Sequence, residues 1–411
     1  MEEDVHARLK NAATVALSCV VALAAAEGAL RVFDPLGRPR KPAATLDYGD
    51  TLRAAGMGPG GLLKEGFEGR VSDGRGGTVW WKNDAQGFRR AADVADRASP
   101  GVVRVFSMGD SFVAGYRVDQ EATFSRLLEK DLAARGLSAE VLVAEIEEPV
   151  NGLFWLQGAS ARFHPDVVLL GLTLGNDITQ AGLALDEPGP FRIAGAPPRV
   201  EPTGSKVTLW ERPEVGVGLP DACVQGSPAR VPLRRALRLG ELVLGSRPQP
   251  IASSRGPGLS RFLLDGANGL GVCLVAPPTE VDVAFTRLER TLLAYRALAT
   301  ERGFALAVLL FPQRYAVQPE DWDATVDGYG LVRSCFDVAT PARRLAAFCA
   351  AEGIPCVDPS KALAMESRRS GRSLYLPAGD MHFNAAGHRA VFEAARWRVA
   401  ALVQGKIPSS M

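Results

Sequence analysis

The sequence predicts an α/β fold in which a central parallel sheet is covered by helices on both faces. Short, strongly apolar runs alternate along the chain with longer stretches whose apolar residues recur at helical spacing. The run at 166–174, "DVVLLGLTL", is apolar enough to be buried on both sides, as a central parallel strand is. With 411 residues, 47% of them hydrophobic, the chain can bury one large core.

The predicted elements follow one another as strand and helix, the order typical of a parallel sheet with crossover helices. Three predicted strands lie at 102–108, 140–146 and 166–174. Two more are predicted to begin at Phe304 and at Ile354. Helices are predicted at 123–135, 153–162, 341–351 and 384–403. An apolar stripe at 285–295 predicts a further helix, which ends before Gly303. Gly136 is expected to stop the first helix.

An apolar segment near the N-terminus predicts a membrane anchor. Residues 12–26 carry no charged side chain, and with 28–33 the stretch approaches the roughly 20 residues that a spanning helix needs. A cleaved signal peptide is one alternative, because "ALAAAEG" offers small residues suited to cleavage, and a buried N-terminal helix is another. Basic residues flank the segment on both sides, so they do not decide its orientation. We expect a single anchor with the main domain on the extracytoplasmic side.

The chain divides into an anchor or signal segment at 1–33, a linker with a small lead-in at 34–101, and a main domain at 102–408. Within that domain, 179–280 reads as an insertion, since residues 181–280 hold 14 glycines and 14 prolines. Residues 225–262 carry seven arginines against one acid, Glu241, which indicates an anionic partner or, equally, a solvated basic face. In the lead-in, Trp80 and Trp81 could stack on sugars, but packing against the main domain is the favoured interpretation.

Overall composition excludes several classes of function. The net charge is +1, so no nucleic-acid partner is expected. The sequence has no CxxC or HExxH pattern and no nucleotide-binding glycine loop, so we expect neither a metal nor another cofactor. If the domain is exported, Cys223 with Cys273 could close the insertion by a disulfide, although spacing does not establish pairing and buried free thiols are the alternative.

One motif places a serine where ligands of such a sheet bind. "GDSF" at 109–112 directly follows the first predicted strand, and ligands of open α/β sheets bind at the carboxyl ends of the strands. Gly-Asp-Ser is by itself a common turn, so the motif needs partners elsewhere in the chain.

Three further blocks occur in order after it, and together they resemble the SGNH/GDSL family of serine hydrolases. "NG" of "PVNGLFW" ends at Gly152, "LGND" covers 174–177, and "DMHFNAAGH" covers 380–388. "KNDAQGFRR" and "GYRVDQEATFSRLLEKDL" are similar to the subset of the family that carries an N-terminal membrane segment. The resemblance spans roughly residues 83–395 and implies a flavodoxin-like three-layer α/β/α sandwich.

The resemblance also implies roles for five residues. Ser111 would be the nucleophile and His382 the base that takes its proton. Asp380 would hold the His382 ring in the required tautomer, with a backbone carbonyl in that place as the alternative, because the family often has its acid three residues before the histidine rather than two. The N–H groups of Ser111 and Gly152 and the side-chain amide of Asn176 would bind the oxyanion.

Two other histidines compete for the role of the base. His388 falls inside the last predicted helix, where packing or a surface contact is expected. His164 precedes a strand and so belongs to the opposite edge of the sheet. We therefore keep His382.

The predicted function is that of a membrane-anchored serine esterase or deacylase, acting through an acyl-serine intermediate on an acyl ester, either a small molecule or an acylated glycan. A polysaccharide O-acyltransferase using the same triad is the first alternative, and a noncatalytic glycan-binding or assembly protein is the second. The nature of the acyl group and the oligomeric state do not follow from the sequence.

Overall fold

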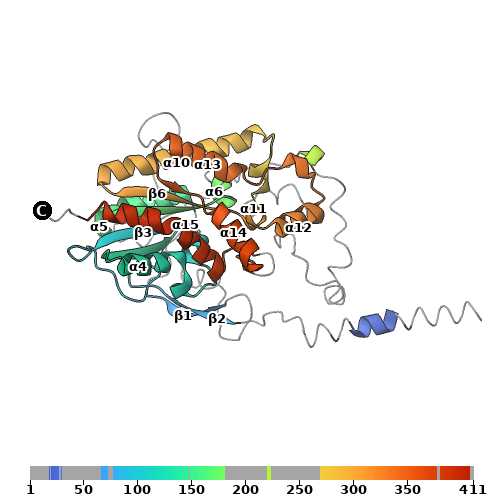
Figure 1. The fold of residues 1–411 in the computed structure, drawn as a ribbon, viewed down its shortest axis with the longest axis horizontal. Coiled ribbons are helices and arrows are strands. Elements are labelled where there is room, and N and C mark those ends of the chain that lie inside the picture. Colours follow the sequence, from blue (N-terminus) through green and yellow to red (C-terminus); the bar gives the residue numbers. More distant parts are fainter. Residues whose placement is uncertain are drawn as a thin grey trace, which may run out of the picture.

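A five-stranded parallel sheet forms the centre of the computed structural model, as Figure 1 shows. The structure describes residues 18, 20–26, 29, 66–72, 77–146, 148–180, 220–223, 269–376 and 380–407. The strands of this sheet are β3 Val103–Gly109, β4 Ala139–Glu145, β5 Val167–Thr173, β6 Ala305–Phe311 and β7 Cys356–Val357. They lie in the order β4-β3-β5-β6-β7, and every neighbouring pair is parallel. In chain order this is 2-1-3-4-5, the flavodoxin-like arrangement, so the predicted parallel sheet is confirmed.

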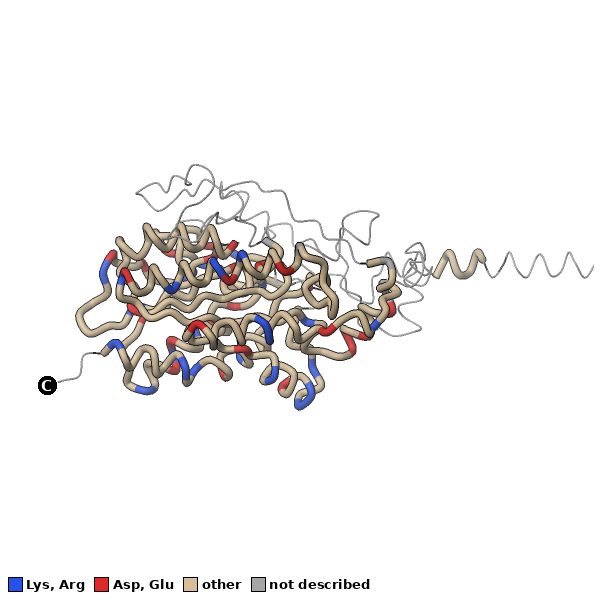
Figure 2. The backbone as a smooth tube through the Cα atoms, turned by 90° about the horizontal axis from the view of Figure 1, so that it is seen from above, with Lys and Arg blue, Asp and Glu red and all other residues tan. Residues whose placement is uncertain are grey.

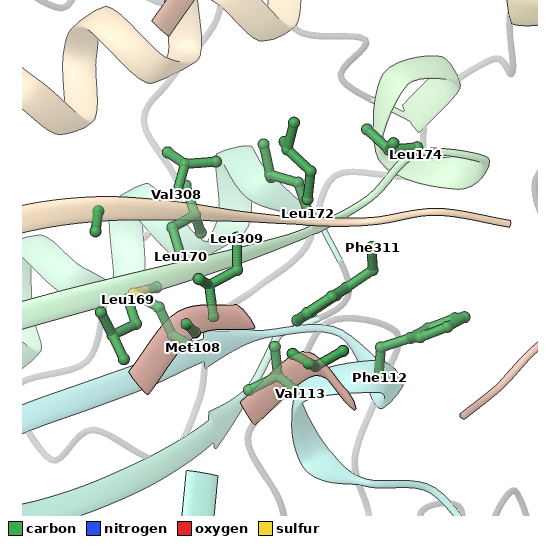
Figure 3. Close-up of a cluster of buried hydrophobic side chains, with 14 of the residues drawn as sticks. Met108, Phe112, Val113, Leu169, Leu170, Leu172, Leu174, Val308, Leu309 and Phe311 are labelled. Atoms are coloured by element: carbon green, nitrogen blue, oxygen red, sulfur yellow. The ribbon is translucent and has the colours of Figure 1, made fainter. Parts of the chain in front are cut away.

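The inner strands are built from residues that suit burial on both faces. Every residue of β3 and of β5 is buried. The registers pair Met108 with Leu170 and Thr173 with Phe311, which places the carboxyl ends of three strands at one edge. Figure 3 shows Met108, Leu170, Phe311 and Phe112 within one apolar cluster near this edge. The core therefore extends to the base of the loops that follow the strands.

Helices cover both faces of this sheet. The helices are α3 Ser111–Ala114, α4 Phe124–Ala134, α5 Pro149–Phe163, α6 Asn176–Gln180, α10 Thr279–Arg302, α11 Arg314–Val317, α12 Pro319–Tyr329, α13 Thr340–Ala351, α14 Ser360–Ser370 and α15 Ala385–Gln404. Helices α4 and α15 pack together on one face, and α5 and α10 pack together on the other (Figure 1). The described part is thus a sandwich of three layers. Figure 2 shows acidic and basic residues interspersed along the outer helices.

Capping residues set several helix ends where the sequence predicts them. The Thr123 side chain accepts a hydrogen bond from the Arg126 N–H, 3.4 Å away, and so begins α4. The Asn384 side chain accepts from the N–H groups of Ala386 and Gly387 at 2.9 and 3.1 Å and begins α15. Gly303, with a φ of 79°, ends α10, as expected.

Helix α5 differs from its prediction in where it begins, and helices α12 and α14 have no counterpart among the predicted elements. Helix α5 begins at Pro149, four residues before its predicted start, because proline suits the first turn of a helix. Helix α14 buries only Leu363 and Ser367, so it lacks a long apolar stripe. Helix α12 is held by a buried ion pair in which Asp321 accepts two hydrogen bonds, each 3.0 Å long, from Arg314.

The lead-in before the main domain contains a small antiparallel hairpin. Its strands are β1 Glu68–Ser72 and β2 Thr78–Lys82. Trp81 is buried against the main domain, and the Arg89 guanidinium lies 3.6 Å from the centroid of its ring. Trp80 is 48% exposed. The packing interpretation therefore fits Trp81 only.

Two predicted segments lie mostly outside the described residues. Of the predicted membrane segment, residues 18, 20–26 and 29 are described, and 20–26 are helical. Among all described residues, no helix has the length and apolar character needed to cross a membrane. Of the Gly/Pro-rich insertion, only its two ends and 220–223 are described, and the arginine-rich stretch 225–262 lies outside the described residues.

The disulfide is not the possible Cys223–Cys273 pair, and Cys273 follows the alternative of a buried free thiol. Cys223 is joined to Cys335, 112 residues away, and Cys273 is a buried free thiol. The Val332 N–H donates to the Cys223 carbonyl at 2.9 Å, which brings Cys335 beside Cys223. The Cys273 side chain instead enters the core, where burial raises the pKa of its thiol to about 12. Spacing along the chain could not reveal this pairing, because it depends on how distant loops meet.

Replacing Cys335 with alanine should lower the free energy of unfolding by about 2–5 kcal/mol, since the crosslink closes a long loop. Denaturant unfolding of the oxidised wild type and of the variant measures this difference. Peptide mapping without reductant should find Cys223 joined to Cys335. A linkage between Cys223 and Cys273 would contradict the assignment.

Candidate active site

Ser111 follows the carboxyl end of the inner strand β3, as the first residue of α3. The strand ends at Gly109, whose φ is 154°. A Cβ on Gly109 would lie 2.7 Å from the Gly171 carbonyl oxygen, so the sharp turn into α3 requires glycine there. The Asp110 side chain then accepts a hydrogen bond from the Phe112 N–H at 2.9 Å and caps the short helix. This turn brings the Ser111 hydroxyl out of the sheet.

His382 reaches Ser111 from the far end of the chain. The Ser111 Oγ lies 2.6 Å from His382 Nε2, although 271 residues separate them. The His382 ring packs against Phe112, with ring centroids 4.9 Å apart, and against Tyr116, at 4.5 Å. These two rings come from the same turn as Ser111, so they orient the imidazole toward its hydroxyl.

Asp380 contacts the other nitrogen of the same ring. Its Oδ1 lies 2.7 Å from His382 Nδ1 and accepts the His382 backbone N–H at 3.0 Å. A carboxylate, rather than the alternative backbone carbonyl, therefore faces Nδ1. When the Nδ1–H group of His382 donates a hydrogen bond to Asp380, Nε2 carries no proton. Nε2 can then accept the proton of the Ser111 hydroxyl.

Two arginines that the sequence analysis missed support Asp380. The Arg117 guanidinium lies 3.4 Å from Oδ2, and Arg314 donates to the Asp380 backbone carbonyl at 2.9 Å. Burial disfavours the charge of Asp380, but hydrogen bonds from His382 and the charges of His382 and Arg117 outweigh it and lower the pKa of this carboxyl. No local pattern marks either arginine, because both reach Asp380 only through the fold.

The predicted oxyanion donors are not equally available. The Ser111 N–H belongs to the first turn of α3, where helix geometry leaves it without an intrahelical partner. The Gly152 N–H instead donates to the Glu148 carbonyl at 2.9 Å inside α5 and is not free to bind an oxyanion. Gly152 also has a packing role, since a Cβ there would lie 2.5 Å from the Tyr295 hydroxyl. Its assignment as a donor remains a prediction that requires the first turn of α5 to open.

Asn176 lies beside the residue that precedes Ser111. It follows β5 as the first residue of α6, and its Nδ2 donates to Asp110 Oδ2 at 3.4 Å. Its side-chain oxygen is buried without a hydrogen-bond partner among the described residues. The amide is thus held next to Ser111 by one long hydrogen bond.

Two buried carboxyl groups, those of Asp110 and Asp177, lie at the ends of β3 and β5. Asp177 accepts the Thr173 N–H at 2.7 Å, which ties α6 to the end of β5. Burial and the nearby charge of Asp110 raise the pKa of Asp177 well above its usual range. Burial also raises the pKa of Asp110. Burial of both groups therefore disfavours their ionised forms.

The two rival histidines lie elsewhere. His164 is exposed at the C-terminal end of α5, at the opposite edge of the sheet from Ser111. His388 is buried in α15, stacks on Phe124 with centroids 5.8 Å apart, and accepts the Phe124 N–H at 3.3 Å. Neither approaches Ser111 as His382 does, and His388 has the packing role expected for it.

The stability of the protein should depend on His388 under acid conditions. Burial, together with the positive charges of Arg89 and His382, lowers the pKa of His388 to about 3. The unfolded chain therefore binds a proton at this residue near its ordinary pKa of about 6.5, whereas the folded chain does not, so stability falls as the pH drops below that value.

Between about pH 8 and about pH 5, the unfolding free energy of the wild type should fall by on the order of 2 kcal/mol more than that of His388→Gln. Denaturant unfolding at both pH values measures the difference. Parallel losses in the two proteins would show that His388 is not the responsible group.

Within the described ranges, no group of three or more His, Cys, Asp or Glu side chains is arranged to hold a metal ion. The site consists of the hydrogen-bonded series Ser111, His382 and Asp380 with Asn176 nearby. Such a series can move a proton from a serine hydroxyl to an imidazole.

The chain matches no family model, and it matches no curated protein. Among solved structures, the acetyl xylan esterase AlAXEase is 12% identical, with a TM-score of 0.36, over 72% of this chain and 99% of its own. TesA is 14% identical, with a TM-score of 0.34, over 73% of this chain and 99% of its own. A carbohydrate acetylesterase family member from Sinorhizobium meliloti is 12% identical, with a TM-score of 0.34, over 74% of this chain and 99% of its own. These likenesses are too distant to carry a conclusion about fold or activity.

Proposed function

We propose that the chain is a serine ester hydrolase of the SGNH/GDSL type, acting on acyl esters through an acyl-Ser111 intermediate. The observation that carries this proposal is the unbroken series of short hydrogen bonds from Ser111 Oγ through His382 to Asp380, at 2.6 and 2.7 Å. A serine hydroxyl is a weak nucleophile at its ordinary pKa, and an adjacent base oriented by a third group is what activates it.

In the proposed reaction, Ser111 Oγ attacks the carbonyl carbon of the ester while His382 Nε2 takes its proton. The imidazolium that forms is stabilised by the Asp380 carboxylate. The negative oxygen of the tetrahedral intermediate is bound by the Ser111 N–H and the Asn176 amide. When the intermediate collapses, the C–O bond to the alcohol breaks and His382 protonates the leaving alkoxide.

The acyl group is then released by the same residues. Water gives a proton to His382 Nε2 as its oxygen attacks the acyl carbon, and the second tetrahedral intermediate expels Ser111 Oγ, which takes the proton back. The products are a carboxylic acid and the free enzyme. If a sugar hydroxyl replaces water in this step, the same residues transfer the acyl group, which is the O-acyltransferase alternative.

Hydrolysis of a chromogenic acetyl ester, with and without an acceptor glycan, tests the proposal. Release of the chromophore and acetate without acceptor supports an esterase. Release that depends on the acceptor and yields an acetylated glycan supports the acyltransferase. Glycan binding without either reaction would support the noncatalytic alternative and overturn the proposal.

We further propose that the domain works on the extracytoplasmic side of a membrane, attached through the apolar segment at 12–33. The Cys223–Cys335 disulfide supports the location, because disulfides persist in oxidising compartments. Cell fractionation of the full chain, followed by alkaline extraction, tests the attachment. Recovery of the protein in the soluble fraction would contradict it.

A further inference from the structure

Two free cysteines lie in contact where helix α13 meets strand β7. Cys349 is in the last turn of α13, and Cys356 is the first residue of β7. Both are thiols in the structure, and a hydrogen bond joins their side chains. The proposed reaction uses neither thiol, so the pair has no role yet.

The turn between the helix and the strand brings the two thiols together. Gly353, with a φ of 66°, reverses the chain after α13, and the Ile354 N–H donates to the Cys349 carbonyl at 2.8 Å. This is the common glycine cap at the C-terminal end of a helix. Strand β7 then pairs with β6, with Cys356 opposite Val308. The backbone that carries each thiol is therefore held by its own hydrogen bonds.

Packing as a small apolar side chain is the ordinary role of a free cysteine. Cys349 fits that role, because it is fully buried in the core. Cys356 does not fit it as well, because it is only partly buried and lies in the outermost strand of the sheet. An oxidant in solution can reach such a sulfur, whereas a thiol buried among apolar groups is inert.

The hydrogen bond makes the two thiols chemically different. The hydrogen bond from Cys356 lowers the pKa of the Cys349 thiol, although burial acts in the opposite direction. The same hydrogen bond and burial raise the pKa of Cys356, on which Asp358 and Arg398 have opposite effects. When the pair loses a proton, the charge therefore forms on Cys349, and Cys356 remains the hydrogen-bond donor.

We propose that Cys349 and Cys356 form a second disulfide, which closes when an external disulfide oxidises them and attaches the end of α13 to the edge of the sheet. Strand β7 is two residues long and pairs with β6 at two positions only. A covalent bond to α13 would strengthen this edge. The inference does not depend on whether the chain hydrolyses esters.

The oxidation takes place in two exchange steps. The Cys356 sulfur attacks one sulfur of the external disulfide while the Cys349 thiolate takes the Cys356 proton, so a mixed disulfide forms and one thiolate leaves. That thiolate removes the proton from Cys349, and the Cys349 sulfur then attacks the Cys356 sulfur and expels the second thiolate. The two cysteines lose two electrons, and the external disulfide is reduced to one thiol and one thiolate.

Thiol counting on the full chain tests whether the bond forms. The chain has six cysteines, so disulfides at Cys223–Cys335 and Cys349–Cys356 would leave only Cys19 and Cys273 as thiols. We expect alkylation in denaturant, after incubation with oxidised glutathione, to modify these two residues alone. Peptide mapping without reductant should find Cys349 joined to Cys356. Alkylation of Cys349 and Cys356, or a link from either to another cysteine, would overturn the proposal.

Thermal unfolding with and without reductant tests what the bond does. In the oxidised protein, Cys356→Ser should lower Tm by about 3–8 °C relative to the wild type, since it removes a crosslink. In dithiothreitol, where neither protein has the bond, the difference should shrink to less than about 2 °C. An equal difference in both conditions would show that Cys356 contributes by packing only and would overturn the proposal.

Cys273→Ser is the matched control. Cys273 is also a buried free thiol, but its sulfur lies 3.9 Å from the Tyr315 hydroxyl and has no cysteine beside it among the described residues. Its replacement should change Tm by the same amount with and without dithiothreitol. A dependence on reductant as large as that of Cys356→Ser would contradict the assignment of the bond to Cys349 and Cys356.

Discussion

Replacing His382 with alanine is expected to lower kcat for ester hydrolysis by about 10⁴- to 10⁶-fold, the range found when the base of a serine triad is removed. The Ser111 hydroxyl has its only short contact to a base at His382 Nε2, 2.6 Å away, within the described residues. Without the imidazole, no group takes the serine proton during attack. Initial rates with a chromogenic acetyl ester measure the loss.

The control for this prediction is His164→Ala. His164 is exposed at the end of α5, far along the chain and at the other edge of the sheet, so its loss should leave most of the activity. Equal losses in the two variants would refute the assignment of His382. A Ser111→Ala variant should be as inactive as His382→Ala, because the two residues act as a unit.

Asp380→Asn is expected to lower kcat by about 10⁴-fold near neutral pH, because an amide in this place favours the wrong tautomer of the histidine. In the wild type, Asp380 Oδ1 accepts from His382 Nδ1 at 2.7 Å, which leaves Nε2 free for the serine proton. An asparagine can instead donate to Nδ1, which would place the ring proton on Nε2. Rates at saturating substrate, together with the unfolding free energy, measure the effect.

The pH dependence of this contribution follows from the lowered pKa of Asp380. Its carboxylate is stabilised in the folded protein, so it stays charged at neutral and mildly acidic pH and is protonated only as the pH falls through the lowered value. Asp323→Asn, an exposed carboxyl paired with Arg333, is the control and should keep full activity. A loss of less than about ten-fold in Asp380→Asn would instead favour a Ser-His dyad.

Local pattern was sufficient for most of the sheet and for the position of Ser111. The strand predicted at 102–108 is β3 with a shift of one residue, and the serine after it lies at the expected edge. Thr123 and Asn384 cap the helices that they were expected to begin. These features depend on apolar periodicity and on capping groups within a few residues, which a sequence displays directly.

Local pattern was insufficient where a role depends on a distant partner. Gly152 is predicted to donate its N–H to the oxyanion, and in the structure this N–H donates to the Glu148 carbonyl, because α5 begins at Pro149. Spacing left open whether Cys273 pairs with Cys223, and the loop that ends at Cys335 is the one that reaches Cys223. Arg117 and Arg314 carry no sequence signal that connects them with Asp380.

The sequence by itself determined the alternation of strands and helices and the turn that follows β3 at Ser111, because these are written in short stretches of residue type and spacing. The candidate triad was implied by the resemblance of the blocks at 109–112 and 380–388 to the SGNH/GDSL family. Only the tertiary structure decided that Ser111 and His382 meet at 2.6 Å, that Arg117 supports Asp380, and that Cys223 is joined to Cys335. The order of the strands and the packing of their loops bring these residues together. Such contacts join segments up to 271 residues apart and therefore leave no periodic trace in the chain.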